Sequence, residues 1–181
     1  MKYDPILVQA VLETEWFDLR PLRKSDQALI GLYSGDRRVA QMSAHIPHPL
    51  PPGAAQDYVR RALSNRRREH VWAMDATKAG GADLMGLIAL EQHDAARAEI
   101  AFWIAPQFWN QGIAQRALQA IVTQNPLNVR EIFGSVFQDN PAGAKVMMRA
   151  GFAYTGDDSC FCVARNTSVT RWCYRKTLAA V

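Results

Sequence analysis

One stretch in the middle of the chain decides the fold, and it runs Ala98-Glu99-Ile100-Ala101-Phe102-Trp103-Ile104-Ala105-Pro106-Gln107-Phe108-Trp109-Asn110-Gln111-Gly112-Ile113-Ala114. Its first part, Ala98–Ile104, predicts a β-strand, and Pro106 ends it because proline has no N–H to give to a sheet. After Gly112 the apolar residues recur at helical spacing, so we expect a helix to begin there. A strand therefore leads through a tight turn into a helix.

The turn Asn110–Ala114 has the features of a phosphate site. The N-terminus of a helix carries unpaired N–H groups and about half a unit of positive charge, and a phosphate accepts several of those bonds. At Gly112 any side chain would obstruct the close approach of a pyrophosphate, and Ala114 is small for the same purpose. A single glycine at a helix start can also serve the turn alone, so the surrounding motifs must decide.

The rest of the chain predicts one α/β domain, 1–181, with a mixed sheet. Expected strands are Glu15–Leu22, His70–Asp75, Leu84–Leu90, Ala98–Ile104, Glu131–Phe137 and a final hairpin from Phe152 to Thr177. Expected helices are Asp26–Tyr33 with Ser25 as its cap, one from Ala55 to near Arg68, one after Gly112, and Asn140–Ala150 with Gly151 as its stop. Between the first two helices, four prolines in residues 42–53 predict a stiff, ordered loop that contains His45 and His48.

Composition narrows the class of protein. The net charge of +4 suits an anionic ligand but is too small to imply a nucleic-acid partner. No apolar run approaches the roughly 20 residues that span a bilayer, and Lys2 and Asp4 are not followed by the apolar core of a signal peptide. Three cysteines without a CxxC or HxxxH pattern predict reduced thiols and no metal site. We therefore expect a cytoplasmic protein with no membrane or nucleic-acid partner.

Two motifs in order identify a family. The stretch 98–114 resembles motif A of the GNAT acetyltransferases, and it looks most like the RimJ/RimL-type branch. At the expected distance, Asp139-Asn140-Pro141-Ala142-Gly143 and Arg149-Ala150-Gly151-Phe152 resemble the second motif of that branch. A weaker match, Leu19-Arg20-Pro21-Leu22 with Ser25-Asp26, lies near the start, so the resemblance covers nearly the whole chain.

Three positions depart from the family pattern. Trp109 stands three residues before the motif-A glycine, where the wider superfamily has arginine or glutamine. Ala101 replaces a glycine of the strand and narrows the expected acetyl pocket. Gly143 replaces the serine of the second motif and removes a hydroxyl near the expected position of the thiol.

The resemblance implies a GNAT-like fold of about seven strands and four helices, with a V-shaped split between the strands 98–104 and 131–137. It implies acetyl-CoA as co-substrate, with its pantetheine arm in the split. The cofactor-binding residues that it implies are Phe102, Trp103, Ile104, Asn110, Gln111, Gly112, Ile113, Ala114 and Asn140. Backbone N–H groups near Phe102–Ile104 would polarise the thioester carbonyl, and Asn140 would support the arm or simply cap its helix.

The sequence is less specific about the residues that bind the acceptor amine. Glu99 is the carboxylate best placed to act as a base or to orient a water, and an exposed or structural role is the alternative. His45 and His48 lie in a loop that forms part of the acceptor pocket in this branch, so they are the predicted substrate-binding residues, with a scaffold role as the alternative. Met147 occupies the position of the usual tyrosine acid, and Tyr154, Ser135 and Cys160 are the weak substitutes.

We therefore expect an enzyme that acetylates a primary amine, either a protein N-terminus or a small molecule. The sequence leaves open whether the protein forms a homodimer. A non-catalytic acyl-CoA-binding or sensor module is the alternative from another class. A dinucleotide-dependent oxidoreductase is disfavoured because no GxGxxG follows an early strand.

Overall fold

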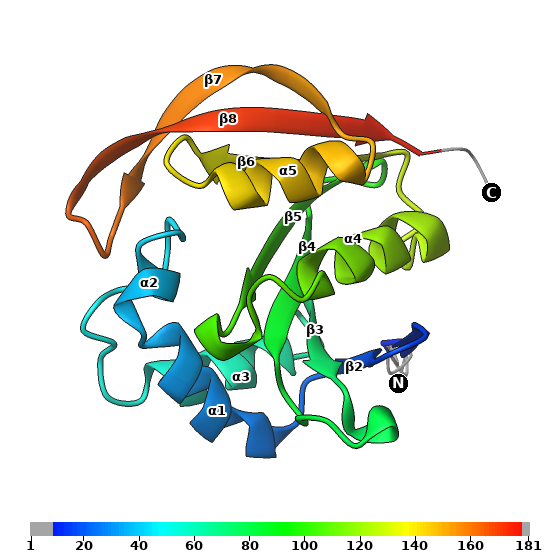
Figure 1. The fold of residues 1–181 in the computed structure, drawn as a ribbon, viewed down its shortest axis with the longest axis vertical. Coiled ribbons are helices and arrows are strands. Elements are labelled where there is room, and N and C mark those ends of the chain that lie inside the picture. Colours follow the sequence, from blue (N-terminus) through cyan, green and yellow to red (C-terminus); the bar gives the residue numbers. More distant parts are fainter. Residues whose placement is uncertain (1–8, 179–181) are drawn as a thin grey trace, which may run out of the picture.

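The computed structural model describes residues 9–178, so Lys2, Asp4 and both ends of the expected domain 1–181 lie outside it. Within this range eight strands form one sheet in the order β1-β2-β3-β4-β5-β6-β8-β7 (Figure 1). The strands are β1 Leu12–Glu13, β2 Asp18–Pro21, β3 Glu69–Asp75, β4 Gly86–Gln92, β5 Arg97–Ile104, β6 Glu131–Phe137, β7 Ala153–Cys162 and β8 Thr167–Thr177. Only β5 and β6 pair in parallel, which confirms the mixed sheet; the unexpected strand is the two-residue β1.

Helices cover both faces of the sheet. They are α1 Gln27–Ser34, α2 Arg37–Ala40, α3 Ala54–Ala62, α4 Ile113–Gln124 and α5 Pro141–Arg149. The apolar sides of α4 and α5 pack in one buried cluster with residues such as Ile100 and Ile132, whereas α1 and α3 pack in a second cluster with residues such as Ala73 and Leu87. Within residues 9–178, none of the helices is long and apolar enough to cross a membrane.

Among the boundaries that differ from the sequence prediction, three differ for a local reason. Phe17 accepts a backbone hydrogen bond from Thr14 at 3.1 Å, so the chain turns there and β2 is shorter than predicted. Asp26 rather than Ser25 precedes α1, and its carboxylate accepts from the backbone N–H of Arg23 at 2.7 Å. The third helix ends at Ala62 instead of near Arg68, because a turn follows it in which the Ser64 hydroxyl oxygen accepts from the backbone N–H of Arg66 at 3.2 Å.

The V-shaped split expected between the two central strands is present. Parallel pairing of β5 with β6 is confined to residues 97–99 and 131–133. Beyond this point β5 stays paired with β4 as far as Ile104, and β6 stays paired with β8 as far as Phe137, so the two strands diverge (Figure 1). Gly134 lies at the apex, where an added Cβ would come within 2.9 Å of both the carbonyl oxygen and Cγ2 of Ile100. The absence of a side chain there allows the two strands to meet.

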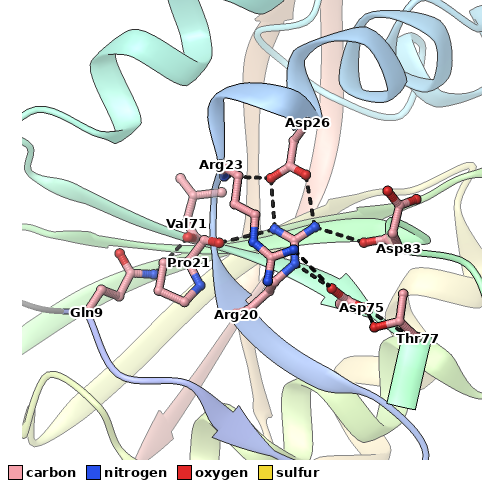
Figure 2. Close-up of polar contacts among 9 residues, drawn as sticks. All are labelled: Gln9, Arg20, Pro21, Arg23, Asp26, Val71, Asp75, Thr77 and Asp83. Carbon is pink, nitrogen blue, oxygen red and sulfur yellow. Dashed lines mark hydrogen bonds and ion pairs between the residues drawn. The ribbon is translucent and has the colours of Figure 1, made fainter. Parts of the chain in front are cut away.

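A buried ionic cluster fastens the N-terminal elements to the sheet. The guanidinium of Arg20 on β2 donates to both carboxylate oxygens of Asp26 at 2.8 and 2.9 Å, and to Asp75 on β3 at 2.5 Å (Figure 2). It also donates to the carbonyl oxygen of Asp83 at 2.9 Å. Arg20 and its two acidic partners are almost completely buried. The N-terminal motif that contains Arg20 and Asp26 therefore has a structural role.

Candidate active site

The predicted phosphate turn has the required backbone geometry. Asn110 and Gly112 both have positive φ angles, 61° and 72°, and Gly112 is the N-cap residue of α4. Helical geometry leaves the N–H groups of Ile113, Ala114 and Gln115 without partners inside the helix. These groups face the side from which a ligand would approach the helix end, and Gly112 presents no side chain to obstruct it.

Arg116, which sequence reasoning missed, supplies positive charge at the same turn. Its Nη1 donates to the carbonyl oxygen of Gln111 at 2.9 Å, and its guanidinium lies 5.5 Å from the ring centroid of Trp16. An added Cβ at Gly112 would lie 3.0 Å from Nη1 of Arg116. The side chain of Gln111 is engaged with the carbonyl oxygen of Gln107 at 3.3 Å. The turn is thus preformed around Gly112.

The open edge of β5 offers hydrogen-bonding groups to the split. The N–H of Ala105 donates to Met85 on the β4 side at 2.9 Å. Because strand residues alternate in direction, the backbone groups of Trp103 also point to β4, and those of Phe102 and Ile104 point into the split. Trp109 already occupies the carbonyl oxygen of Ile104 through an indole hydrogen bond of 2.7 Å. The N–H groups of Phe102 and Ile104 are therefore the available donors, and the side chain of Trp103 packs against the second buried cluster.

These features fit an acyl-CoA. The turn provides N–H donors for a pyrophosphate, and the free edge of β5 can pair with the amides of a pantetheine arm as it would with a strand. In the first turn of α4, the buried Oε1 of Gln115 has no hydrogen-bond partner among the described residues. Buried polar atoms are rarely left unpaired, so this oxygen has the capacity for a further hydrogen bond.

Asn140 acts as the N-cap of α5. Its side-chain oxygen accepts from the backbone N–H of Gly143 at 3.0 Å, as expected of a helix cap. An added Cβ at Gly143 would lie 2.9 Å from both the Asn140 amide nitrogen and Cγ1 of Val136. A side chain at position 143 would therefore require Asn140 or Val136 to move. Met147 is 1% exposed in the core, so its position holds no proton donor.

Glu99 lies on the sheet face opposite α4 and α5. Its neighbours Ala98 and Ile100 are buried in the cluster with those helices, so alternation directs Glu99 to the other side. Its carboxylate is 3.2 Å from Nε2 of His93, whose ring packs edge-on against Phe133 at 5.0 Å between centroids. Glu99 is only partly exposed and belongs to the last register pair before the split, Glu99 with Phe133.

A hollow of about 400 Å³ occupies this face beside Glu99. It is lined by Glu99, Phe133, Gly134, Ser135, Thr155, Asp158, Arg171, Cys173, Tyr174 and Arg175. Arg171 donates to both oxygens of Asp158 at 2.7 and 2.6 Å and keeps the pKa of that carboxyl below its usual value. Burial, with a smaller effect of Asp158, raises the pKa of the Cys173 thiol, so it is protonated at neutral pH.

The candidate proton donors separate in space. Ser135 lines the hollow and is paired in register with Cys173. The hydroxyl of Tyr154 is engaged with Asp157 at 2.7 Å, and Cys160 is not among the lining residues. Ser135 is therefore the best placed of the substitutes considered, and Cys173 is a second candidate donor that the sequence did not suggest.

The structure places His45 and His48 apart from this hollow. Both are exposed in the proline-rich loop, and Nδ1 of His48 lies 3.1 Å from the carbonyl oxygen of Gly35. That contact ties the loop to the end of α1. Among the described residues, Glu91, His93 and Glu99 have ligand atoms within 4.8 Å of one another, but exposed carboxylates with one histidine do not by themselves make a metal site.

Comparison with known proteins agrees with this geometry. A family profile described as the acetyltransferase (GNAT) domain matches residues 17–153, well over half of the chain. The uncharacterized N-acetyltransferase YoaA of Bacillus subtilis (strain 168) is 26% identical over 152 residues, which cover 81% of this chain and 84% of that protein.

Solved structures share the fold. RimL, a ribosomal L7/L12 alpha-N-protein acetyltransferase in complex with coenzyme A, has a TM-score of 0.79 at 16% identity and matches 95% of this chain and 100% of that one. The spermidine N-acetyltransferase from Vibrio cholerae, with CoA and spermine, has a TM-score of 0.75 at 19% identity and matches 92% and 98% of the two chains.

Proposed function

The chain belongs to the GNAT acetyltransferase family, and on that premise we propose that it transfers an acetyl group from acetyl-CoA to a primary amine by direct attack in a ternary complex. The observation that carries the proposal is the continuity of the site. The open edge of β5 leads from the N-terminus of α4 to Glu99 and the hollow beside it. One end suits a pyrophosphate, and the other offers a carboxylate to an amine.

On the donor side, the turn Asn110–Ala114 holds the pyrophosphate, with Gly112 allowing its close approach. Phe102 and Ile104 donate N–H groups to the arm and to the thioester carbonyl, where they stabilise negative charge as it develops. Acetyl-CoA supplies the activated acyl group.

On the acceptor side, Glu99 accepts a proton from the amine directly or through a water. Deprotonation at pH 7 costs about 4.6 kcal/mol for a lysine-like ammonium but only about 1 kcal/mol for an α-amino group. A partly exposed carboxylate such as Glu99 is a sufficient base for an α-amino group and a weak one for a lysine-like amine. Ser135 or Cys173 returns a proton to the departing thiolate.

The proposal includes membership of the RimJ/RimL-like branch and a cytoplasmic location. The motif resemblance supports the branch, and the three unpaired cysteines fit a reducing compartment. The acceptor is a protein N-terminus or a small-molecule amine. RimL modifies a ribosomal protein and the Vibrio cholerae enzyme is named for spermidine, so the shared fold accommodates both kinds of acceptor.

Substitution of Gly112 tests the donor site. Gly112→Asp places a carboxylate where the pyrophosphate is expected and should abolish acetyl-CoA binding by calorimetry while the fold persists. Gly80→Asp is the matched control, because Gly80 has a similar φ of 74° in a turn with open space around it. Equal loss of binding in both variants, or unchanged affinity in Gly112→Asp, would remove the turn from the cofactor site.

The alternative is a non-catalytic acyl-CoA-binding or sensor module. Its support is that Met147 and Gly143 stand where the family pattern has a tyrosine and a serine. Turnover distinguishes it from the enzyme. The enzyme releases CoA thiol from acetyl-CoA faster when an acceptor amine is added. A sensor binds acetyl-CoA but gives no turnover across a broad panel of α-amino peptides, polyamines and amino sugars.

Glu99→Gln tests the base. The rate should fall at neutral pH and recover partly at higher pH, where the amine loses its proton unaided. Glu91→Gln is the control, since Glu91 is the exposed cross-strand partner of Glu99 on β4. A pH–rate profile that matches the wild type would exclude Glu99 from the mechanism.

A further inference from the structure

A short segment crosses the wide end of the split. We name residues 37–44, which comprise α2 and the four residues after it, the strap (Figure 1). On the β5 side, the guanidinium of Arg38 lies 5.8 Å from the ring centroid of Trp109, in the turn that follows β5. On the β6 side, the strap meets the tip of the β7–β8 hairpin. The strap therefore connects the exits of the two strands that diverge.

Arg165, at the tip of the hairpin, makes the central contact on the β6 side. Its Nε donates to the carbonyl oxygen of Gln41 at 2.7 Å. Its two terminal nitrogens donate to the two carboxylate oxygens of Asp139 at 2.6 and 3.2 Å, and the guanidinium lies 5.1 Å from the ring centroid of Phe137. The Arg165 side chain is 19% exposed. One planar group thus fixes the strap, the hairpin tip and the end of β6 together.

Two further contacts hold the same junction. The N–H of Val163 donates to the carbonyl oxygen of Ala44 at 3.1 Å, and the thiol of Cys162 lies 3.3 Å from the carbonyl oxygen of Ser43. Together with the bond to Gln41, they engage most of the second half of the strap. Beyond Ala44 the chain continues directly into the proline-rich loop with His45 and His48.

We propose that Arg165 is a positioning residue for the acceptor: it holds the strap, and the loop 45–53 after it, in a fixed place over the mouth of the split. The inference rests on the proposed acyl transfer. Asp139 directly precedes Asn140, the cap of α5, so the guanidinium also sets the strap relative to the predicted cofactor side. The fork of an arginine fixes direction as well as charge, and a lysine cannot reproduce this geometry.

The test is Arg165→Ala, with steady-state kinetics for each substrate and hydrogen–deuterium exchange. Release of the strap and of the loop after it should weaken acceptor binding, and a loss of about 1.4 kcal/mol corresponds to a factor of ten, so we expect the KM for the acceptor amine to rise roughly tenfold. We expect kcat at saturating acceptor and the affinity for acetyl-CoA to stay within about twofold. Exchange should accelerate in residues 37–53 and stay unchanged in α3.

Two variants make the test specific. Arg165→Lys keeps the charge without the fork, so its acceptor KM should lie between those of the wild type and Arg165→Ala. Arg60→Ala removes another arginine paired with an aspartate, Asp57 at 2.8 Å, on the exposed side of α3, and should leave both KM values unchanged.

An unchanged acceptor KM in Arg165→Ala, or an equal loss of acetyl-CoA and acceptor affinity, would overturn the inference. If the wild-type protein acetylates no amine, the proposed function fails. Hydrogen–deuterium exchange then tests by itself whether Arg165 holds the strap in place. Unchanged exchange in residues 37–53 then overturns the positioning role, and accelerated exchange confined to this segment supports it.

Discussion

Two arginines join distant parts of this chain by the same chemistry, yet the carboxylates that they bind differ strongly in exposure. Arg20 binds Asp26 and Asp75, and the side chains of all three are at most 7% exposed (Figure 2). Arg165 binds Asp139, whose side chain is 55% exposed, at the rim of the split. Both guanidiniums grip a carboxylate with two nitrogens and also bind backbone carbonyl oxygens.

Burial determines whether the loss of such a contact changes the stability of the protein or only its local geometry. Removal of one partner from a buried ion pair leaves an uncompensated charge in a poorly solvated place, which costs far more than the pair contributes. At the rim, water takes over the lost bonds, so stability changes little and only the geometry is released. Substitution of Arg20 should therefore lower the stability measured by denaturation, whereas substitution of Arg165 should change the enzyme kinetics.

The largest expected effect follows removal of Arg20. Arg20→Ala leaves Asp26 and Asp75 buried without their partner and should lower the free energy of unfolding by about 3–5 kcal/mol, measured by urea denaturation. Since the free energy of unfolding of an ordinary domain is about 5–15 kcal/mol, the variant should populate the unfolded state more than the wild type does. Arg20→Lys, which keeps the charge, should lose less. A loss of less than about 1 kcal/mol of unfolding free energy in Arg20→Ala would contradict the importance of burial for this contact.

An intermediate effect depends on pH. Burial opposes ionisation of Asp75, but hydrogen bonds from Thr77 and Arg20 and the charge of Arg20 outweigh it, so the pKa of Asp75 is lowered. A lowered pKa in the folded state means that Asp75 stabilises the protein above the unfolded value of about 3.9, and that this stabilisation is lost as the pH falls through the folded value. Asp75→Asn should therefore flatten the decline of unfolding free energy with acid, and parallel curves would contradict this.

The smallest effect on stability should follow Arg165→Ala. Its contact with a half-exposed aspartate is worth about 0–1 kcal/mol, so the urea midpoint should shift little while the acceptor KM rises. A loss as large as that of Arg20→Ala would show that Arg165 is part of the core, and the contrast between rim and interior would be wrong.

Local signals made much of the fold predictable from sequence. The strand Glu131–Phe137 was predicted with the bounds that β6 has, and the cap at Asn140 was anticipated. The start of α4 at Gly112 was also anticipated, because glycine and periodic apolar residues act over a few positions. The short helix α2 was missed, although Asp36 is its cap and accepts from the N–H of Arg38 at 2.8 Å. Aspartate is also common in turns, so an aspartate just after a helix does not by itself indicate the cap of another helix.

The missing parts of the site depend on contacts between residues that are distant in sequence. Arg165 and Gln41 are 124 positions apart, and the acceptor of their bond is a backbone carbonyl, which no residue type reveals. Cys173 comes opposite Ser135 only through the register of β8 with β6. The pairing of His93 with Glu99 likewise arises from the turn between β4 and β5. Glu99 could be proposed from its strand position alone, and its surroundings could not.

The apex at Gly134 and the strap together turn the split into a triangle, with β5 and β6 as its other two sides. Two bars joined at one end open freely, but a third bar makes the frame rigid against shear. Half of the strap is helical and rises about 1.5 Å per residue, whereas a residue of extended chain spans at most about 3.5 Å. The length of the strap therefore limits how far apart the free ends of the strands stand. The width of the split at its open end thereby depends on a few residues that belong to neither strand.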